Sequence, residues 1–219
     1  MDTLPLRIDI VSDVVCPWCV IGYLRLQRAI ASFGDQFATE VHWLPFELNP
    51  QMPASGENLR EHLARKYGTT PQESIQARQR LTDLGADLGF EFSYRDDMCM
   101  YNTFRAHQLL HWAAAYDRQT DLSLRLFRDF FQHQKNVDDI SVLTEAAAAV
   151  GLNAREAGEI LDNQTYAGTV RELEQQISSQ GVHSVPLFIL NRQYGIGGAQ
   201  EVETFRRELQ TLIDEAGAG

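Results

Sequence analysis

The stretch Ser12-Asp13-Val14-Val15-Cys16-Pro17-Trp18-Cys19 places two thiols three positions apart, between a strand-like run and a helical pattern. The run from Leu6 to Val11 alternates apolar residues with charged ones, which predicts a short strand. From Cys19 onward, apolar residues recur at helical spacing on one face as far as Gly34: Cys19, Tyr23, Leu26, Ala29, Ile30 and Phe33. A Cys-x-x-Cys motif is therefore predicted at the start of a helix that follows a strand.

The position of Cys16 favours a reactive thiol. We expect it in the first helical turn, where unpaired backbone N–H groups and the helix dipole stabilise negative charge. Pro17 suits this turn because it has no N–H to leave unsatisfied, and Trp18 would shield or recognise a docked substrate. Since the thiolate is the reactive form of cysteine, we predict Cys16 as the nucleophile and Cys19 as the resolving thiol.

A structural zinc site is the alternative interpretation of the motif, because Cys-x-x-Cys also occurs as half of a four-ligand set. A second half would have to be assembled from Cys99 and His107. The six histidines include just one close pair, His107 and His111, and the others are His42, His62, His133 and His183. The strand-then-helix context favours redox chemistry, and we predict no metal site.

Composition limits the class of protein. The chain has 219 residues and 44% hydrophobic content, enough to bury a core, and its net charge of -11 argues against binding nucleic acid or an anionic membrane surface. Charged residues interrupt the apolar stretch from Leu4 to Val15, so we expect neither a signal peptide nor a spanning helix. Three cysteines without a disulfide framework suit a reducing compartment, which predicts a cytoplasmic protein.

The remaining elements follow a split pattern. Residues 37–48 are predicted as a second strand, residues 57–181 carry only helical signals, and residues 185–196 are predicted as a hairpin before a last amphipathic helix from Glu201 to about Ala216. We therefore predict a discontinuous α/β domain of residues 1–56 and 182–219, with an inserted helical domain of residues 57–181.

These features resemble the DsbA-like proteins of the thioredoxin superfamily, and in particular their cytosolic, FrnE-type branch. The resemblance rests on the cysteine stretch and on three further segments: Trp43 to Pro50, Asn102-Thr103 with Ala106-His107, and Ser184 to Phe188. It covers nearly the whole chain. The fold class it implies is α/β, a thioredoxin fold with a large all-helical insertion.

The resemblance also implies positions for substrate contacts. Pro186 would be a cis-proline facing the cysteines, and Val185 would offer backbone groups to a bound peptide or thiol. Asn102, Thr103 and His107 would line the substrate groove from the helical insertion. His183, close to this proline, is equally compatible with a solvated loop position, and Cys99 between two methionines is predicted to be a buried, inert thiol.

The predicted function is thiol–disulfide exchange, in the reductase or isomerase direction in a reducing cytosol. Two alternatives remain open. One is a glutathione-dependent isomerase or transferase, as in the related 2-hydroxychromene-2-carboxylate isomerases and kappa-class glutathione transferases, which place serine where this chain has Cys16. The other is a non-catalytic, chaperone-like binding module. The expected partners are proteins or small molecules that contain a thiol or a disulfide, and glutathione is a candidate redox partner. No cofactor is expected. A homodimer is compatible with the acidic helical surface.

Overall fold

A four-stranded mixed sheet forms the centre of the computed structural model, which describes residues 3–217, and its strand order is β2-β1-β5-β6. The strands are β1 (Leu4–Ser12), β2 (Phe37–Pro45), β5 (Leu187–Leu190) and β6 (Tyr194–Gly197). β1 pairs with β2 in parallel and with β5 in antiparallel, and β6 closes a hairpin with β5. The central strand β1 therefore ends beside the loop that carries the cysteines.

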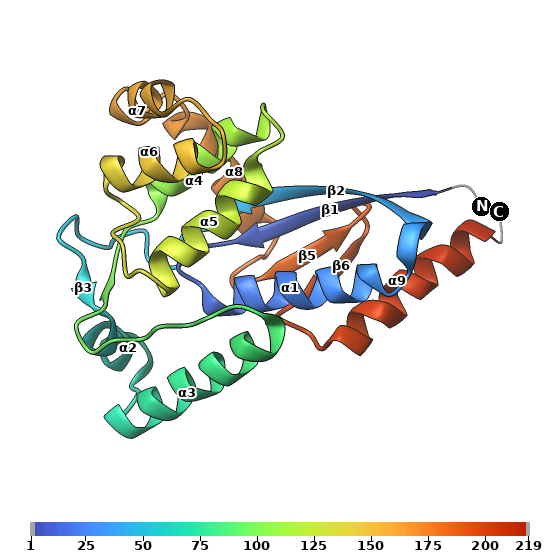
Figure 1. The fold of residues 1–219 in the computed structure, drawn as a ribbon, viewed down its shortest axis with the longest axis horizontal. Coiled ribbons are helices and arrows are strands. Elements are labelled where there is room, and N and C mark those ends of the chain that lie inside the picture. The colour runs from blue at the N-terminus through green and yellow to red at the C-terminus, as the bar shows by residue number, and fades with distance from the viewer. Residues whose placement is uncertain (1–2, 218–219) are drawn as a thin grey trace.

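Helices α1 (Pro17–Ala31) and α9 (Val202–Gly217) pack against each other beside the sheet (Figure 1). The buried side of α1 includes Cys19, Tyr23, Leu26 and Ala29, as the sequence spacing predicted. Arg25 links this helix to the chain after β6, because its guanidinium donates to the Ala199 carbonyl at 2.8 Å. The helix that begins at the cysteine motif is thus held from both the sheet and the C-terminal segment.

The segment between β2 and β5 is largely helical and lies at the end of the sheet where α1 begins (Figure 1). Side-chain caps define several of its helix starts, including a full capping box between Thr70 and Glu73. A 3-10 turn, η1 (Gly34–Gln36), lies between α1 and β2. The segment from β2 to β5 contains, in chain order, β3 (Glu57–Asn58), α2 (Leu59–Tyr67), α3 (Pro71–Leu88), β4 (Cys99–Met100), α4 (Phe104–Ala114), α5 (Gln119–Phe131), α6 (Ile140–Ala149), α7 (Ala154–Asp162) and α8 (Ala167–Ser179).

The structure differs from the sequence-based expectation in the segment 57–181 and at the end of β2. Residues 57–181 are not entirely helical, because β3 and β4 form a small antiparallel pair with Glu57 opposite Met100 and Asn58 opposite Cys99. Strands of two residues are too short to give an alternating pattern. The second strand, β2, ends at Pro45, whereas the sequence predicted that it would reach residue 48. Directly after Pro45, Phe46 donates its N–H to the Ser12 carbonyl, and the chain leaves the sheet.

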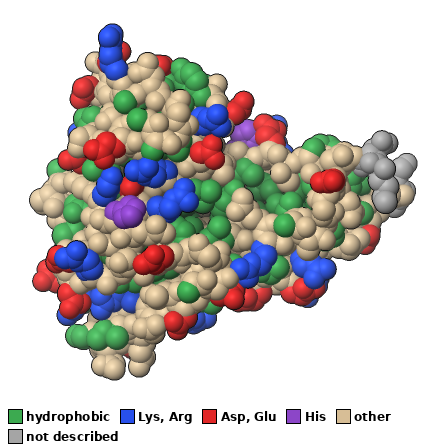
Figure 2. Space-filling model, in the orientation of Figure 1, with side chains coloured by type: hydrophobic (Ala, Val, Ile, Leu, Met, Phe, Trp, Pro, Cys, Tyr) green, Lys and Arg blue, Asp and Glu red, His purple; other side chains and the backbone are tan. Residues whose placement is uncertain are grey.

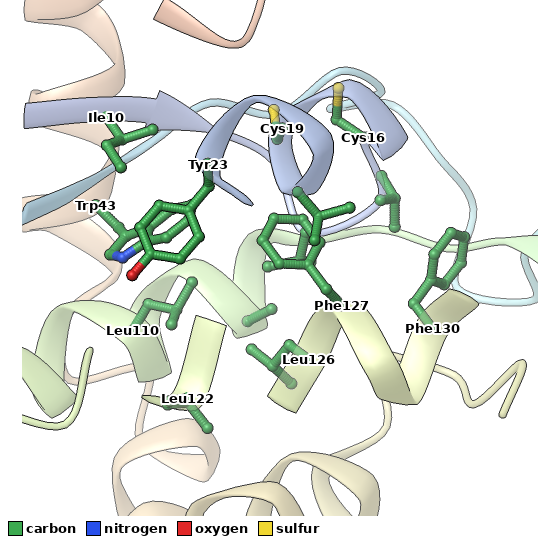
Figure 3. Packing of buried hydrophobic residues seen from close by; sticks show 14 of the residues in the cluster. Ile10, Cys16, Cys19, Tyr23, Trp43, Leu110, Leu122, Leu126, Phe127 and Phe130 are labelled. Atoms are coloured by element: carbon green, nitrogen blue, oxygen red, sulfur yellow. The ribbon is translucent and has the colours of Figure 1, made fainter. Parts of the chain in front are cut away.

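Helix α5 docks on the free edge of β2 and joins the two halves of the molecule. The Gln119 amide accepts from the Trp43 N–H at 2.8 Å and donates to the Trp43 carbonyl at 3.0 Å, so it takes the place of a neighbouring strand. Figure 3 shows Phe127 of the same helix packed beneath the start of α1, in one continuous core with Trp43 and Tyr23. The helical insertion therefore contributes directly to the packing under the cysteines.

Acidic and basic side chains are interspersed over the face shown in Figure 2, with apolar side chains between them. None of the helices within residues 3–217 combines the length and the apolar character that crossing a membrane requires.

Candidate active site

Cys16 and Cys19 lie at the N-terminal end of α1, where both sulfur atoms can be followed in Figure 3. Cys16 is the N-cap residue, with extended backbone angles, and Pro17 opens the helix; the prediction that Cys16 lies inside the first turn was wrong by one position. The Cys16 N–H donates to the Asp13 carbonyl at 2.9 Å, and the Cys19 N–H donates to the Cys16 carbonyl at 3.1 Å. These bonds fix both cysteines relative to the end of β1.

The two thiols are unpaired in this structure and have different surroundings. The Cys19 side chain has no exposed surface, whereas Cys16 retains 4% exposure. Burial raises the pKa of the Cys19 thiol well above its usual value, and the hydrogen bond and the charge of the Cys16 sulfur raise it further, against smaller opposite effects of Ser12 and the Asp13 backbone. Cys19 is therefore held as a neutral thiol that can donate a hydrogen bond to Cys16.

The loop before β5 faces the cysteine pair. The Val185–Pro186 peptide bond is cis, as the resemblance implied. The Cys16 Sγ lies 4.0 Å from the Val185 carbonyl oxygen, and the Pro186 carbonyl accepts from the Gly198 N–H at 2.8 Å. The structure thus brings Val185, Pro186 and Cys16 together, although whether the two loop residues bind substrate stays a prediction.

Residues of the helical insertion surround the motif on its other side. The Arg80 guanidinium from α3 lies 5.8 Å from the centre of the Trp18 ring, a cation–π distance. Tyr94, which the sequence reasoning missed, is half-buried near Cys16, with its hydroxyl buried. Burial and the charge of Cys16 raise the pKa of its phenol, while Arg78 acts in the opposite direction. No local pattern connects residue 94 to residue 16, so only the fold reveals this neighbour.

Asp13 and His107 form a buried pair directly behind the cysteine loop. The Asp13 carboxylate accepts from the Leu48 N–H at 2.7 Å, and its other oxygen lies 3.5 Å from His107 Nε2 without a hydrogen-bond partner. His107 Nε2 also lies 3.2 Å from the Phe46 carbonyl. Burial alone would lower the pKa of His107, but Asp13, with Glu174 and Glu47, outweighs it and raises the pKa. Asp13 is a second residue that the sequence reasoning did not single out.

The three insertion residues predicted to line a groove lie in buried or half-buried positions. His107 and Thr103 are buried, and Thr103 is the N-cap residue of α4. Asn102 donates to the Glu47 carboxylate at 3.1 Å and accepts from the Phe104 N–H at 2.9 Å. Their roles in substrate binding remain predictions.

Glu47 and its neighbours border a surface pocket of about 300 Å³ close to the cis-proline loop. The pocket is lined by Phe46, Glu47, Pro50, Glu174, Ser178, Val182 and His183. The Arg171 guanidinium contacts both Glu47 and Glu174, so the two carboxylates share one cation. His183 is exposed at the edge of this pocket, three residues before Pro186.

Cys99 is not the buried thiol that its flanking methionines predicted. It is half-buried in β4, and its Sγ lies 3.6 Å from the Asp97 carbonyl. Met98 and Met100 are buried on either side, because alternate residues of an extended chain point to opposite faces. Within the residues that the structure describes, no three His, Cys, Asp or Glu side chains converge as a metal site requires.

Comparisons with known proteins match this architecture over almost the whole chain. Residues 7–210 match the family model described as DSBA-like thioredoxin domain. The crystal structure of a probable DsbA oxidoreductase from Streptomyces coelicolor is 32% identical, with a TM-score of 0.89 over 96% of this chain and 91% of that one. The uncharacterized protein YwbO of Bacillus subtilis is 26% identical over 94% of this chain and 96% of its own length.

A more distant structure shares the fold. The cytosolic disulfide reductase DsbM from Pseudomonas aeruginosa, solved with glutathione, superposes with a TM-score of 0.66 over 95% of this chain and 99% of that one, at 18% identity.

Proposed function

Because this chain belongs to the DSBA-like thioredoxin domain family, we propose that it is a thiol–disulfide oxidoreductase in which Cys16 is the nucleophile and Cys19 the resolving thiol. The observation that carries the proposal is the difference between the two sulfur atoms. Cys16 caps the start of α1, where the helix dipole stabilises an anion, whereas Cys19 is fully buried as a neutral thiol.

The exchange proceeds in two displacements. The Cys16 thiolate attacks one sulfur of a substrate disulfide, forms a mixed disulfide and expels the other substrate sulfur as a thiolate, which takes up a proton. Cys19 then loses its proton and attacks the Cys16 sulfur, which releases the second substrate thiol and leaves the Cys16–Cys19 disulfide. The reverse sequence oxidises a substrate dithiol with the same atoms.

We propose the reductase or isomerase direction in a cytoplasmic setting, with glutathione as a candidate redox partner. The likeness in fold to a cytosolic disulfide reductase solved with glutathione supports this choice. Substrates would be proteins or small molecules that carry a thiol or a disulfide. The FrnE-type branch, and the division into residues 1–56 with 182–219 and an inserted domain of residues 57–181, are parts of the same proposal.

The substrate would dock beside the cis-proline loop. Pro17 and Trp18 directly follow Cys16 in the chain and would form one border of the docking surface. The Val185 carbonyl, 4.0 Å from the Cys16 sulfur, would form another. An extended peptide can add backbone hydrogen bonds at such a loop. Asn102, Thr103 and His107 would support this surface from behind.

Trapping of the mixed disulfide tests the proposal. A Cys19→Ser variant should accumulate a covalent complex with a disulfide substrate, because the resolving thiol is absent, and the complex should dissociate on adding dithiothreitol. A Cys16→Ser variant is the matched control and should form no such complex. Equal trapping by both variants would overturn the assignment of roles.

The glutathione-dependent alternative is tested by the double variant Cys16→Ser with Cys19→Ser. If the protein activated the thiol of bound glutathione, this variant would retain conjugation of an aromatic electrophile. We expect it to lose exchange activity without gaining conjugation.

A further inference from the structure

The second displacement requires a proton acceptor. Cys19 must lose its proton to attack the mixed disulfide, yet its side chain has no exposed surface, so bulk water cannot take the proton directly. The raised pKa of the thiol makes the loss of this proton costly at neutral pH. A proton acceptor inside the protein, close to Cys19, would lower this cost.

Ser12 is a neighbour of both Cys19 and a small, partly open cavity. Its hydroxyl favours the Cys19 thiolate and so lowers the pKa of that thiol, against the larger effect of burial. Ser12 also lines a cavity of about 10 Å³, together with His107 from α4 and Ser123 from α5. This volume corresponds to about one water molecule.

Most side chains around the cavity are apolar, but Ser12, Ser123 and His107 bring polar groups to it. Ser123 has no exposed surface, and its hydroxyl has no hydrogen-bond partner within the protein. A water molecule there could bond to the Ser123 and Ser12 hydroxyls and to His107, within the two to four partners typical of buried water. Such a water molecule would join Ser12 to His107.

His107 has the properties of a proton acceptor. Its Nε2 faces the Phe46 carbonyl, which can only accept a hydrogen bond, so Nε2 carries a hydrogen and Nδ1 is the nitrogen that can gain one. The Asp13 carboxylate, 3.5 Å from Nε2, stabilises the imidazolium that results. Burial opposes this charge, but the carboxylates of Asp13, Glu174 and Glu47 outweigh it.

Two further ionisable side chains, Arg171 and His111, also lie close to His107 or to its cavity. Arg171 from α8 pairs with both Glu47 and Glu174, which moderates their effect. His111, one turn further along α4, lines the same cavity, but burial lowers its pKa and no carboxylate is among the causes of that shift. Of the two histidines at the cavity, His107 is therefore the one whose protonated form is stabilised.

We propose that Ser12, a buried water molecule and the His107–Asp13 pair form a proton path that deprotonates Cys19 when it resolves the mixed disulfide. The inference rests on the proposed function. The Cys19 proton passes through Ser12 and the water to His107 Nδ1, and the Cys19 electron pair forms the bond to Cys16. The substrate sulfur leaves as a thiolate and is protonated by solvent, and His107 later returns its proton to solvent. No further oxidant or reductant is needed.

A two-phase reaction separates the two displacements. The reduced protein is mixed in a stopped-flow instrument with an aromatic disulfide that releases the coloured thionitrobenzoate anion. Attack by Cys16 releases one anion in the first phase, and attack by Cys19 on the mixed disulfide releases another in the second. The Cys19→Ser variant, which can give only the first phase, identifies it.

His107→Gln should slow the second phase at least tenfold, the lower range for general base catalysis, and leave the first within about twofold. The rise of the second-phase rate with pH should also change, because wild type gains neutral His107 as pH rises and the variant does not. Ser12→Ala, a smaller change, should slow the second phase in the same way. His111→Gln is the matched control and should leave both phases unchanged.

The outcomes distinguish the two proposals. Equal slowing of both phases by His107→Gln, or an unchanged second phase in both His107→Gln and Ser12→Ala, would overturn the proton path while leaving exchange by the cysteines intact. If the wild type released no second anion and formed no Cys16–Cys19 disulfide, the proposed function itself would fail.

Discussion

The contact between Gln119 and the edge of β2 gives a stability prediction whose size follows from the structure. The two Gln119 hydrogen bonds satisfy the N–H and the carbonyl of Trp43, which has no strand beside it on that edge. Gln119→Leu keeps a side chain of comparable size but removes both bonds. Each buried group left without a partner costs about 1–3 kcal/mol, so we expect the free energy of unfolding to fall by about 2–6 kcal/mol.

Urea denaturation followed by tryptophan fluorescence measures this loss. With a slope of about 2 kcal/mol per molar urea, the midpoint should fall by about 1–3 M. Thr120→Val is the matched control, because it removes only the hydroxyl that accepts from the Trp43 indole at 3.0 Å, a single bond worth about 1 kcal/mol. A Gln119→Leu variant within about 0.5 kcal/mol of wild type would show that this contact does not hold α5 on the sheet.

Two further predictions concern packing and pH. Gly85→Ala should destabilise the protein by about 1–3 kcal/mol in the same assay, because a Cβ there would lie 2.5 Å from the Phe90 carbonyl oxygen. Alanine stabilises an unhindered helix relative to glycine, so an increase in stability would contradict this packing. The stability difference between wild type and His107→Gln should be largest below pH about 6.5, the unfolded value for histidine, and should shrink as pH rises through the raised pKa of folded His107. Unfolding curves across a pH series measure it, and a difference that grows with pH would contradict the Asp13–His107 pairing.

Much of the architecture could be predicted from the sequence because its signals are local. The run from Leu6 to Val11 predicted β1, and the stripe from Cys19 predicted the buried face of α1. The β3–β4 pair could not be predicted, because two residues give no periodicity. Local patterns therefore determine the long elements and leave the short ones open.

The candidate site divides in the same way. The cysteines could be assigned from their spacing and their place before a helix, since both signals lie within a few residues. Tyr94 near Cys16, and Asp13 facing His107, depend on how the helical insertion docks on the sheet. No pattern along the chain encodes such long-range neighbours, so the structure was needed to find them.

The central claim is that the Cys16 and Cys19 sulfur atoms exchange electrons with a substrate as one pair. The most direct measurement is equilibration of the purified protein with glutathione buffers of graded redox potential, followed by mass spectrometry of alkylated peptides. The account predicts a single two-electron transition in which Cys16 and Cys19 become linked to each other while Cys99 stays alkylated. Persistent alkylation of both Cys16 and Cys19 under oxidising buffers, with no linkage between them, would contradict it.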